Sequence, residues 1–243
     1  IGAGTTNLVV IEDGEVQQLL NQRGLLYTGS GAKASRASFD KVAAKQLCER
    51  RGIPTPRYEV LGKGGRRTLP LPVVIKPARQ GSSIGLHKVL SDSEWEAAFQ
   101  DSLSYDGRVL VEAYIPGREL TVGIVEHDAL PIVEIAAPDG WYDYQAKYTK
   151  GASQYLVPAP LEPAITRRAQ ELALGTFDAL GCRGFARVDF RLSPEDELYM
   201  LELNNIPGFT ETSLLPKAAA QAGISFSSLC DRIMSLATVD PEG

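Results

Sequence analysis

Residues 185–204 constrain the fold most, because they contain two runs in which polar and apolar side chains alternate. The first run is Phe-Ala-Arg-Val-Asp-Phe at 185–190, and the second is Leu-Glu-Leu-Asn at 201–204. Alternation with a period of two is typical of a half-buried strand. An acidic turn, Pro-Glu-Asp-Glu, lies between the runs. The sequence therefore predicts two adjacent antiparallel strands, over 185–192 and 198–203, with one polar face.

Four side chains are expected on that polar face. Arg187 and Asp189 lie two residues apart, as do Glu202 and Asn204, so each pair points to one side of its strand. Asp189, Glu202 and Asn204 offer three oxygen donors without a nitrogen or sulfur ligand, a set that suits Mg²⁺ holding substrate phosphates. The alternative is a solvated sheet face with a surface ion pair. We interpret the pattern as a candidate cation site.

Helical and strand-like segments alternate along the rest of the chain. Further strands are predicted at residues 25–28, 57–61, 73–76, 108–113, 119–125 and 132–136. Helices are predicted at residues 15–23, from Ser38 or Asp40 to 51, from Ser91 or Asp92 to 102, and at 163–180, 217–222 and 225–236. Residues 138–160 lack apolar periodicity, which indicates a long functional or mobile loop. The fold class is α/β with α+β lobes, not a plain Rossmann repeat.

Charge and composition argue against several classes of protein. The 25 Lys and Arg residues against 30 Asp and Glu residues give a net charge of −5, so binding to nucleic acid by bulk attraction is not expected. No apolar run approaches the ~20 residues of a membrane helix, and no secretory signal is recognisable. Three widely spaced cysteines fit a reducing cytosol. With two histidines, any catalysis is expected to use Lys, Arg, carboxylates, hydroxyls and backbone amides.

A second candidate site follows the apolar run 73–75. Lys76 ends this run, and a segment rich in Gly and Ser, which includes Ser82 and Ser83, comes shortly after it. An ammonium group and the amides of such a loop can surround phosphate oxygens. The segment matches neither the P-loop nor the dinucleotide-binding glycine pattern. A plain turn between two strands, with Lys76 reaching solvent, is the alternative.

Three further segments offer polar groups, each with a simpler explanation. Glu112 lies near a Pro-Gly pair, where a carboxylate can accept from an adenine amine or a ribose hydroxyl, but taken alone the segment favours a β-turn with surface charges. Lys147 lies in the predicted loop and either neutralises phosphate or decorates a flexible surface. Residues 208–214 precede a predicted helix, so Ser213 belongs to an anion site or to an N-cap.

Taken in order, these segments resemble the D-alanine–D-alanine ligase family of the ATP-grasp superfamily. The matching stretches are Tyr-Thr-Gly-Ser-Gly at 27–31, Ser-Phe-Asp-Lys at 38–41, Val-Ile-Lys-Pro at 74–77, Gly-Ser-Ser-Ile-Gly at 81–85, Val-Glu at 111–112, Gly-Arg-Glu-Leu-Thr-Val at 117–122, Tyr-Asp-Tyr-Gln-Ala-Lys-Tyr at 142–148, Ala-Arg-Val-Asp at 186–189, Leu-Glu-Leu-Asn at 201–204 and Pro-Gly-Phe-Thr at 207–210. They cover nearly the whole chain, and their order is more specific than any one of them. The resemblance implies an ATP-grasp fold, in which two lobes containing antiparallel sheets enclose the nucleotide.

The resemblance also implies which residues bind ATP and metal. The residues implied at the nucleotide are Lys41, Lys76, Ser83, Glu112, Ile115 and Glu119. The two lysines would contact phosphates, Glu112 and Ile115 would lie at the adenine, and Glu119 would lie at the ribose. Two Mg²⁺ ions, or Mn²⁺ in their place, would be held by Asp189, Glu202 and Asn204.

Catalytic and substrate-binding residues are implied in the same way. Ser82 belongs to the loop over the phosphates, and Lys147 would reach the γ-phosphate from the long loop. Arg187 and the amide of Gly208 would stabilise a tetrahedral oxyanion. A tyrosine at position 148 resembles the dipeptide-forming enzymes, which makes Tyr148 a further catalytic candidate. The carboxylate of the second D-alanine would be received by Ser213 and Leu214.

The activity implied is ATP-dependent ligation of two D-alanines through an acyl phosphate, for peptidoglycan precursors, by a cytoplasmic homodimer. The implied domains are a remnant of an N-terminal substrate domain at 1–40, a central lobe at 41–118, and a C-terminal lobe at 119–243 that carries the Mg²⁺ site and the mobile loop. The family's Gly-Gly-x-Ser-x-Glu segment, which binds the first D-alanine, does not occur in this sequence. Two alternatives therefore stay open: a nucleotide-binding relative without catalysis, and a ligase for other amino or hydroxy acids.

Overall fold

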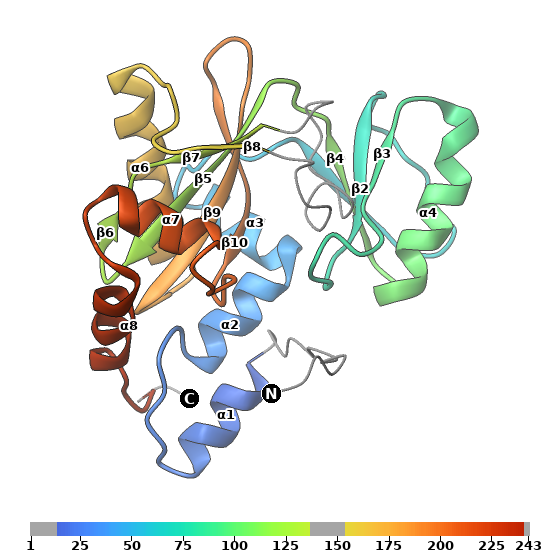
Figure 1. Ribbon diagram of the computed structural model, residues 1–243. Helices are drawn as coiled ribbons and strands as arrows, with labels where there is room; N and C mark the ends of the chain where they lie inside the picture. The colour runs from blue at the N-terminus through green and yellow to red at the C-terminus, as the bar shows by residue number, and fades with distance from the viewer. Residues whose placement is uncertain (1–13, 137–153, 241–243) are drawn as a thin grey trace, which may run out of the picture.

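The computed structural model describes residues 14–136 and 154–240, which form two antiparallel sheets with surrounding helices (Figure 1). The smaller sheet has four strands in the order β1-β4-β2-β3. The larger sheet has six strands in the order β10-β9-β5-β7-β8, with β6 paired to β5. The pairings are antiparallel in both sheets. The predicted α/β class, with two lobes that contain antiparallel sheets, is confirmed.

The elements have the following bounds. The strands are β1 (Tyr58–Leu61), β2 (Val73–Pro77), β3 (His87–Val89), β4 (Val109–Ala113), β5 (Arg118–Val125), β6 (Asp128–Ala129), β7 (Val133–Ala136), β8 (Gln154–Leu156), β9 (Phe185–Leu192) and β10 (Leu198–Asn204). The helices are α1 (Glu15–Gln22), α2 (Ala32–Phe39), α3 (Lys41–Glu49), α4 (Asp92–Asp106), α6 (Pro163–Ala179), α7 (Leu214–Gln221) and α8 (Phe226–Ser235).

Helix α4 covers one face of the smaller sheet, on the right in Figure 1. Alternate apolar residues of β2 and β4, such as Ile75 and Val111, pack with Phe99 of this helix in a buried core. Ser91 caps the helix in a capping box with Glu94, so of the two predicted starts Ser91 is confirmed. The helix continues past the predicted end at residue 102 and ends where Gly107 adopts a left-handed conformation. The opposite face of the smaller sheet carries the polar residues Lys76 and Glu112 together with the apolar Leu110.

The larger sheet is covered by α6 on one side, while α7 and α8 pack against other residues of β5 and β7. Leu120, Val122 and Ile124 alternate along β5 and face the core that α6 completes. The intervening residues of β5 therefore point to the opposite face of the sheet. This opposite face carries the polar residues of the predicted hairpin.

Helix α3 contacts both lobes. Its residues Ala44 and Cys48 belong to the core of the larger lobe, whereas Val42 packs with Ala78 and Leu110 of the smaller one. The carboxylate of Asp40 caps the helix by accepting from the amides of residues 42 and 43 at 3.1 Å. Of the two predicted starts, Asp40 is therefore confirmed. Ser38 lies inside α2 instead.

Four short segments differ from the sequence predictions. The predicted strand at 25–28 is wrong, because only an isolated bridge forms there, between Tyr27 and Thr238. Strand β8 lies in the segment 138–160 that was predicted as loop, and it pairs with β7. Strands β3 and β6 were not predicted. Elements of two or three residues depend on their partner strands, so the local pattern carries little signal for them. Residues 137–153 lie outside the described residues.

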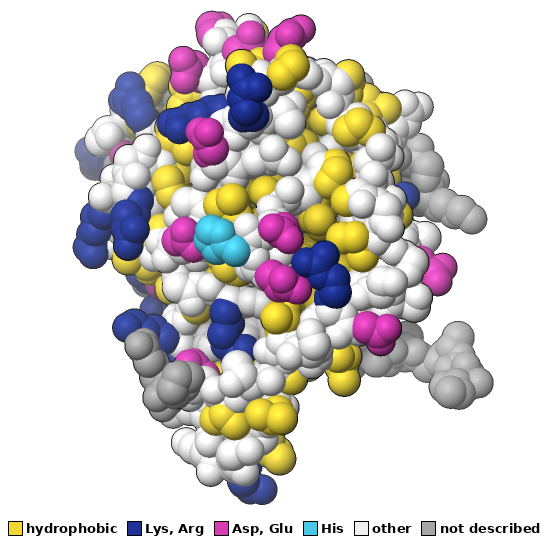
Figure 2. Space-filling view, turned by 90° about the vertical axis from the view of Figure 1, so that its left-hand side faces the viewer, with side chains coloured by type: hydrophobic (Ala, Val, Ile, Leu, Met, Phe, Trp, Pro, Cys, Tyr) yellow, Lys and Arg dark blue, Asp and Glu magenta, His cyan; other side chains and the backbone are white. Residues whose placement is uncertain are grey.

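No helix among residues 14–136 and 154–240 combines the length and apolar character needed to cross a membrane. Figure 2 looks onto the side where α6 and α8 lie, and it shows acidic and basic side chains interspersed with apolar ones. Two surface pairs on these elements are Arg232 with Glu126, at 3.2 Å, and His127 with Asp178, at 2.9 Å. This face therefore carries both signs of charge close together.

Candidate active site

The hairpin of β9 and β10 brings the four predicted polar residues together. Glu202 lies opposite Asp189 in the register, and Asn204 lies opposite Arg187. The buried carboxylate of Asp189 accepts from Nε and Nη2 of Arg187, at 2.9 and 3.0 Å, and from Nδ2 of Asn204, at 2.9 Å. Thr121 of β5 donates its hydroxyl to the same carboxylate at 2.5 Å. The predicted shared face is confirmed.

The donors at this position fit a hard divalent cation. Asp189, Glu202 and Asn204 present two carboxylates and one amide oxygen on adjacent strands, and such oxygen ligands are those that Mg²⁺ prefers. Among the residues described here, no group of three or more His, Cys, Asp and Glu side chains is placed to hold a metal ion. The third protein donor would therefore be the Asn204 amide, and a cation would replace contacts that Asp189 now makes with Arg187 and Asn204.

A buried cluster of three charges lies on β4 and its neighbours. Glu112 is 2% exposed, and its Oε2 lies 2.6 Å from Nζ of Lys76 on β2. Its Oε1 contacts Nζ of Lys45 on α3, which is fully buried and also donates to the hydroxyl of Thr55. One carboxylate thus lies between two ammonium groups from two different elements.

This arrangement shifts the pKa values of Glu112 and Lys45. Burial opposes ionisation of Glu112, but the charges of Lys45 and Lys76 outweigh it and lower the pKa of the carboxyl. Burial also lowers the pKa of Lys45, and the attraction of Glu112 only partly opposes that effect. The negative charge of Glu112 is therefore what allows two ammonium groups to be held in the interior.

Lys41 lies beside the Gly- and Ser-rich loop. It is the first residue of α3, its amide donates to the carbonyl of Ala78 at 3.0 Å, and its ammonium donates to the carbonyl of Gln80. Ser82 and Ser83 have φ angles of 54° and 58°, in the left-handed region. Residues in such conformations can turn successive amides into a concave anion site. The structure thus places Lys41 and the loop together, next to the end of the strand that carries Lys76.

The two remaining residues predicted at the nucleotide are Ile115, which lies between β4 and β5, and Glu119, near the start of β5. The carbonyl of Ile115 accepts from Nε of Arg191 at 3.1 Å. Glu119 lies opposite Arg191 in the register of β5 and β9, and their side chains are 3.4 Å apart. Glu119 and Thr121 are two residues apart on β5, so Glu119 shares the face on which Thr121 meets Asp189.

The predicted acceptor of the second substrate lies at the start of α7. Ser213 occupies the N-cap position and Leu214 is the first helical residue, three residues before the predicted start. The hydroxyl of Ser213 makes no capping bond but accepts from the amide of Thr210 at 3.0 Å. Gly208 lies beside it, since a Cβ there would be 3.3 Å from Ser213 Oγ. The remaining predicted residues, Lys147 and Tyr148, lie outside the described residues.

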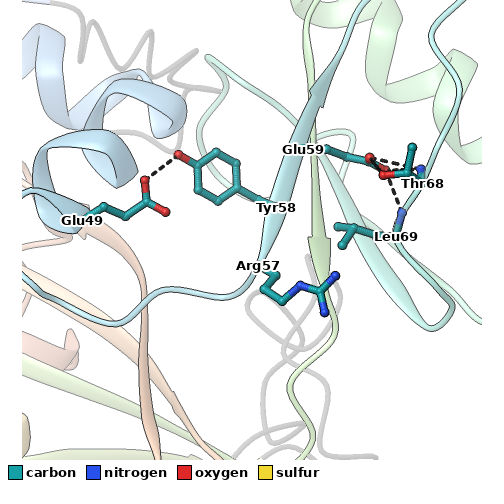
Figure 3. Close-up of a pocket in the computed structure, with 6 residues that line it drawn as sticks. All are labelled: Glu49, Arg57, Tyr58, Glu59, Thr68 and Leu69. Atoms are coloured by element: carbon teal, nitrogen blue, oxygen red, sulfur yellow. Dashed lines mark hydrogen bonds between the residues drawn. The ribbon is translucent and has the colours of Figure 1, made fainter.

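An open hollow of about 540 Å³ lies at the outer edge of the smaller sheet (Figure 3). In it, the hydroxyl of Tyr58 donates to Glu49 at 3.0 Å, and burial together with this carboxylate raises the pKa of Tyr58 to about 12. Glu59 accepts from the amide of Thr68 at 2.9 Å. Both carboxylates therefore already have partners. Its lining residues are Glu49, Arg57, Tyr58, Glu59, Thr68 and Leu69, which include none of the predicted site residues.

Sequence reasoning missed three residues of this region: Lys45, Thr121 and Arg191. Lys45 follows Lys41 by four residues, so both lie on one side of α3, and this spacing was an available signal. Arg191 continues the alternation of Arg187 and Asp189 along β9. Thr121 had no local signal, because only the pairing of β5 with β9 brings it to Asp189.

Comparisons with known proteins agree on one family. Residues 47–235 match the family model described as D-ala D-ala ligase C-terminus. The D-alanine–D-alanine ligase of Methylacidiphilum infernorum (isolate V4) is 49% identical over 225 residues, which cover 93% of this chain and 74% of that protein.

Solved structures give the same picture. The VanG D-Ala:D-Ser ligase from Enterococcus faecalis superposes with a TM-score of 0.82 at 32% identity, covering 93% of this chain and 69% of that one. The D-alanine–D-alanine ligase from Bacillus anthracis, complexed with ATP, gives a TM-score of 0.81 at 30% identity, covering 93% and 74%. With its fold and most of its length matched in this way, the chain belongs to the D-alanine–D-alanine ligase family of ATP-grasp proteins.

Proposed function

We propose that this protein uses ATP to join two D-alanines through an acyl phosphate. The observation that carries the proposal is the shared polar face of β5, β9 and β10, where Arg187, Asp189, Glu202 and Asn204 meet. Relatives that bear the name D-alanine–D-alanine ligase support it. The product would serve peptidoglycan precursor synthesis in the cytoplasm, and we expect a homodimer.

Two lysines and one loop would hold the triphosphate. Lys41 and Lys76 would contact its oxygens, and the amides around Ser82 and Ser83 would close over them. Lys76 now pairs with Glu112, so phosphate binding would draw it away from that carboxylate. Lys45 would then remain as the counter-ion of Glu112.

The base and sugar would lie along the segment that joins the two sheets. Glu112 and Ile115 would lie at the adenine, and Glu119 would accept from a ribose hydroxyl. A carboxylate that accepts from such a hydroxyl discriminates against sugars that lack it, because this hydrogen bond is then lost.

Asp189, Glu202 and Asn204 would hold two Mg²⁺ ions. When bound, Mg²⁺ neutralises negative charge on the phosphate oxygens. Asp189 also pairs with Arg187, so its carboxylate lies next to a cationic side chain as well.

The chemistry would proceed in two steps. A carboxylate oxygen of the first D-alanine attacks the γ-phosphorus, and the bond from that phosphorus to the bridging oxygen breaks, which releases ADP. The amine of the second D-alanine then attacks the acyl carbonyl, and inorganic phosphate leaves. Arg187 and the amide of Gly208 would hold the oxyanion between these events, and Lys147 would approach the transferred phosphoryl group.

The substrates need further positioning. Ser213 and Leu214, at the start of α7, would receive the carboxylate of the second D-alanine. Ser82 and Tyr148 would complete the site of the first. Excluding water from this site matters, because water would hydrolyse the acyl phosphate.

The direct test is release of phosphate from ATP by the 243-residue chain, with and without D-alanine. We expect release to depend on D-alanine and on Mg²⁺. Equal release with and without D-alanine would contradict the ligase proposal. ATP binding without any release would favour the nucleotide-binding relative that does not catalyse.

A second candidate is a ligase that accepts another acid as the second substrate. It is favoured by the similarity to a D-Ala:D-Ser ligase, whose TM-score is comparable to that of the D-alanine–D-alanine ligase. A panel of D-alanine, D-serine and D-lactate, with product masses measured, separates the two. We expect D-alanyl-D-alanine as the main product.

A further inference from the structure

Arg191 is a buried arginine of β9 that contacts the segment joining the two sheets. It is 5% exposed, and its guanidinium donates to two backbone carbonyls of that segment, Ile115 at 3.1 Å and Gly117 at 2.9 Å. A planar guanidinium presents its donors in a rigid fork that reaches both carbonyls at once, whereas an ammonium group on a flexible stem has no such fixed geometry. This segment, residues 115–119, is called the crossover below. Arg191 of β9 therefore holds the crossover by hydrogen bonds to the backbone of the crossover.

The same guanidinium contacts side chains at both ends of the crossover. Its Nη1 lies 3.4 Å from Oε2 of Glu119, where β5 begins. It also lies 5.7 Å from the ring centre of Tyr114, where β4 ends. One buried side chain thus connects Tyr114, directly after β4, with Glu119, at the start of β5.

Backbone packing at Gly117 also holds the crossover against β9. Gly117 has a φ of 114°, and a Cβ at that position would collide with the carbonyl oxygen of Leu192. The chain therefore passes directly over the end of β9, next to Arg191. Close approach and the hydrogen bonds fix the same five residues, 115–119, onto the larger lobe.

We propose that Arg191 is a positioning residue for nucleotide recognition, which fixes the crossover 115–119 and aims the carboxylate of Glu119 at the ribose. The inference rests on the proposed function in one respect only, namely that ATP lies against Ile115 and Glu119. Arg191 itself need not touch the nucleotide. Its effect is to hold the recognising groups in one arrangement before ATP arrives, which lowers the entropy lost on binding.

The test measures the affinity of the full chain for ATP, 2′-deoxy-ATP and 3′-deoxy-ATP by calorimetry, without D-alanine. We expect Arg191→Met to weaken ATP binding about 10-fold, as suits the loss of charged hydrogen bonds. The wild type should bind one of the two deoxy nucleotides more weakly than the other. For that nucleotide, we expect Arg191→Met to reduce the ratio of its dissociation constant to that of ATP. A general loss of folding would not change that ratio selectively.

Two variants guard against misfolding and non-specific effects. Arg191→Lys keeps the charge but lacks the planar fork, so its affinity and ribose preference should lie between those of the wild type and Arg191→Met. Arg232→Met removes an arginine from the far surface, where it pairs with Glu126, and should leave both quantities unchanged. In a Glu119→Gln background, Arg191→Met should no longer alter the ribose preference.

The outcomes separate this inference from the proposed function. A wild type that does not bind ATP would contradict the proposed function itself. Suppose that the wild type binds ATP and prefers the complete ribose, and that folded Arg191 variants show the same affinity and preference. This result would overturn the role of Arg191 but not the proposed function. A wild type that binds ATP but does not distinguish the three nucleotides would also overturn that role.

Discussion

Nζ of Lys76 lies 2.6 Å from Oε2 of Glu112, and both side chains are buried. On the other side of the same carboxylate lies Lys45, which has no exposed surface. A buried carboxylate with one cation would be left unpaired whenever that cation moved to a phosphate. With two, Glu112 keeps a counter-ion in both states.

Replacing Lys45 should therefore destabilise the fold. We expect Lys45→Met to lower the free energy of unfolding by about 3 kcal/mol, because removal of one member of a buried ion pair leaves charge uncompensated. Urea denaturation measures the change. The double variant Lys45→Met/Glu112→Gln, which removes both charges, should lose less than the two single variants together. Additive losses would mean that the two residues are not coupled.

Asp40 should make stability depend on pH. Burial opposes its ionisation, but hydrogen bonds from Arg108, from the amide of Ala43 and from Arg79 outweigh that effect and lower its pKa. A lowered pKa in the folded state adds stability above the unfolded value of 3.8, and this contribution disappears as the pH falls through the folded value. The charge-neutral Asp40→Asn should remove it.

The measurement compares unfolding free energies of the wild type and Asp40→Asn across pH. The difference should be constant well above pH 3.8 and shrink below it. Asn still caps helices, whereas Asp40→Ala should lose about 1 kcal/mol more at every pH because the cap is gone. A difference between wild type and Asp40→Asn that grows toward acid would have the wrong sign.

The sequence predicted the parts of the site that depend on local periodicity. Alternation placed Arg187 and Asp189 on one face, and the start of α3 was predicted at Ser38 or Asp40, of which the structure has Asp40. It did not predict the neighbours that come from distant segments. Lys45 meets Glu112 only because α3 packs beside the smaller sheet, and Thr121 meets Asp189 only through strand pairing. These partners lie 67 or 68 residues apart in the sequence, so no local sequence pattern predicts their contact. Strand β8 was also missed, because it is defined by its pairing with β7.

Glu202 is the sharpest test of the cation site. We expect Glu202→Gln to reduce D-alanine-dependent phosphate release at least about 100-fold, because an amide is a weaker ligand for Mg²⁺ than a carboxylate. The exposed Glu197 lies in the turn of the same hairpin, and Glu197→Gln should retain activity. Circular dichroism should show both variants folded. Full activity of Glu202→Gln would remove this residue from the metal site.

Gly117 should tolerate no side chain. Gly117→Ala places a Cβ against the carbonyl oxygen of Leu192 and strains a φ of 114°, so we expect a loss of about 1–3 kcal/mol in unfolding free energy. Gly64 also has a positive φ, of 76°, but has open space around it. Gly64→Ala should therefore show the backbone strain alone. Thermal melts of the two variants give the comparison, and equal losses would mean that the collision is relieved without cost.

The register of β9 determines the orientation of three polar side chains at once. Arg187, Asp189 and Arg191 project from alternate positions of one strand, toward the proposed oxyanion position, the proposed cation site and residues 115–117. A single inserted or deleted residue upstream within this strand would turn the three side chains into the hydrophobic interior together. Length changes in β9 should therefore abolish nucleotide recognition and catalysis in one event, whereas the neighbouring acidic turn at 194–197 can vary in length without that penalty.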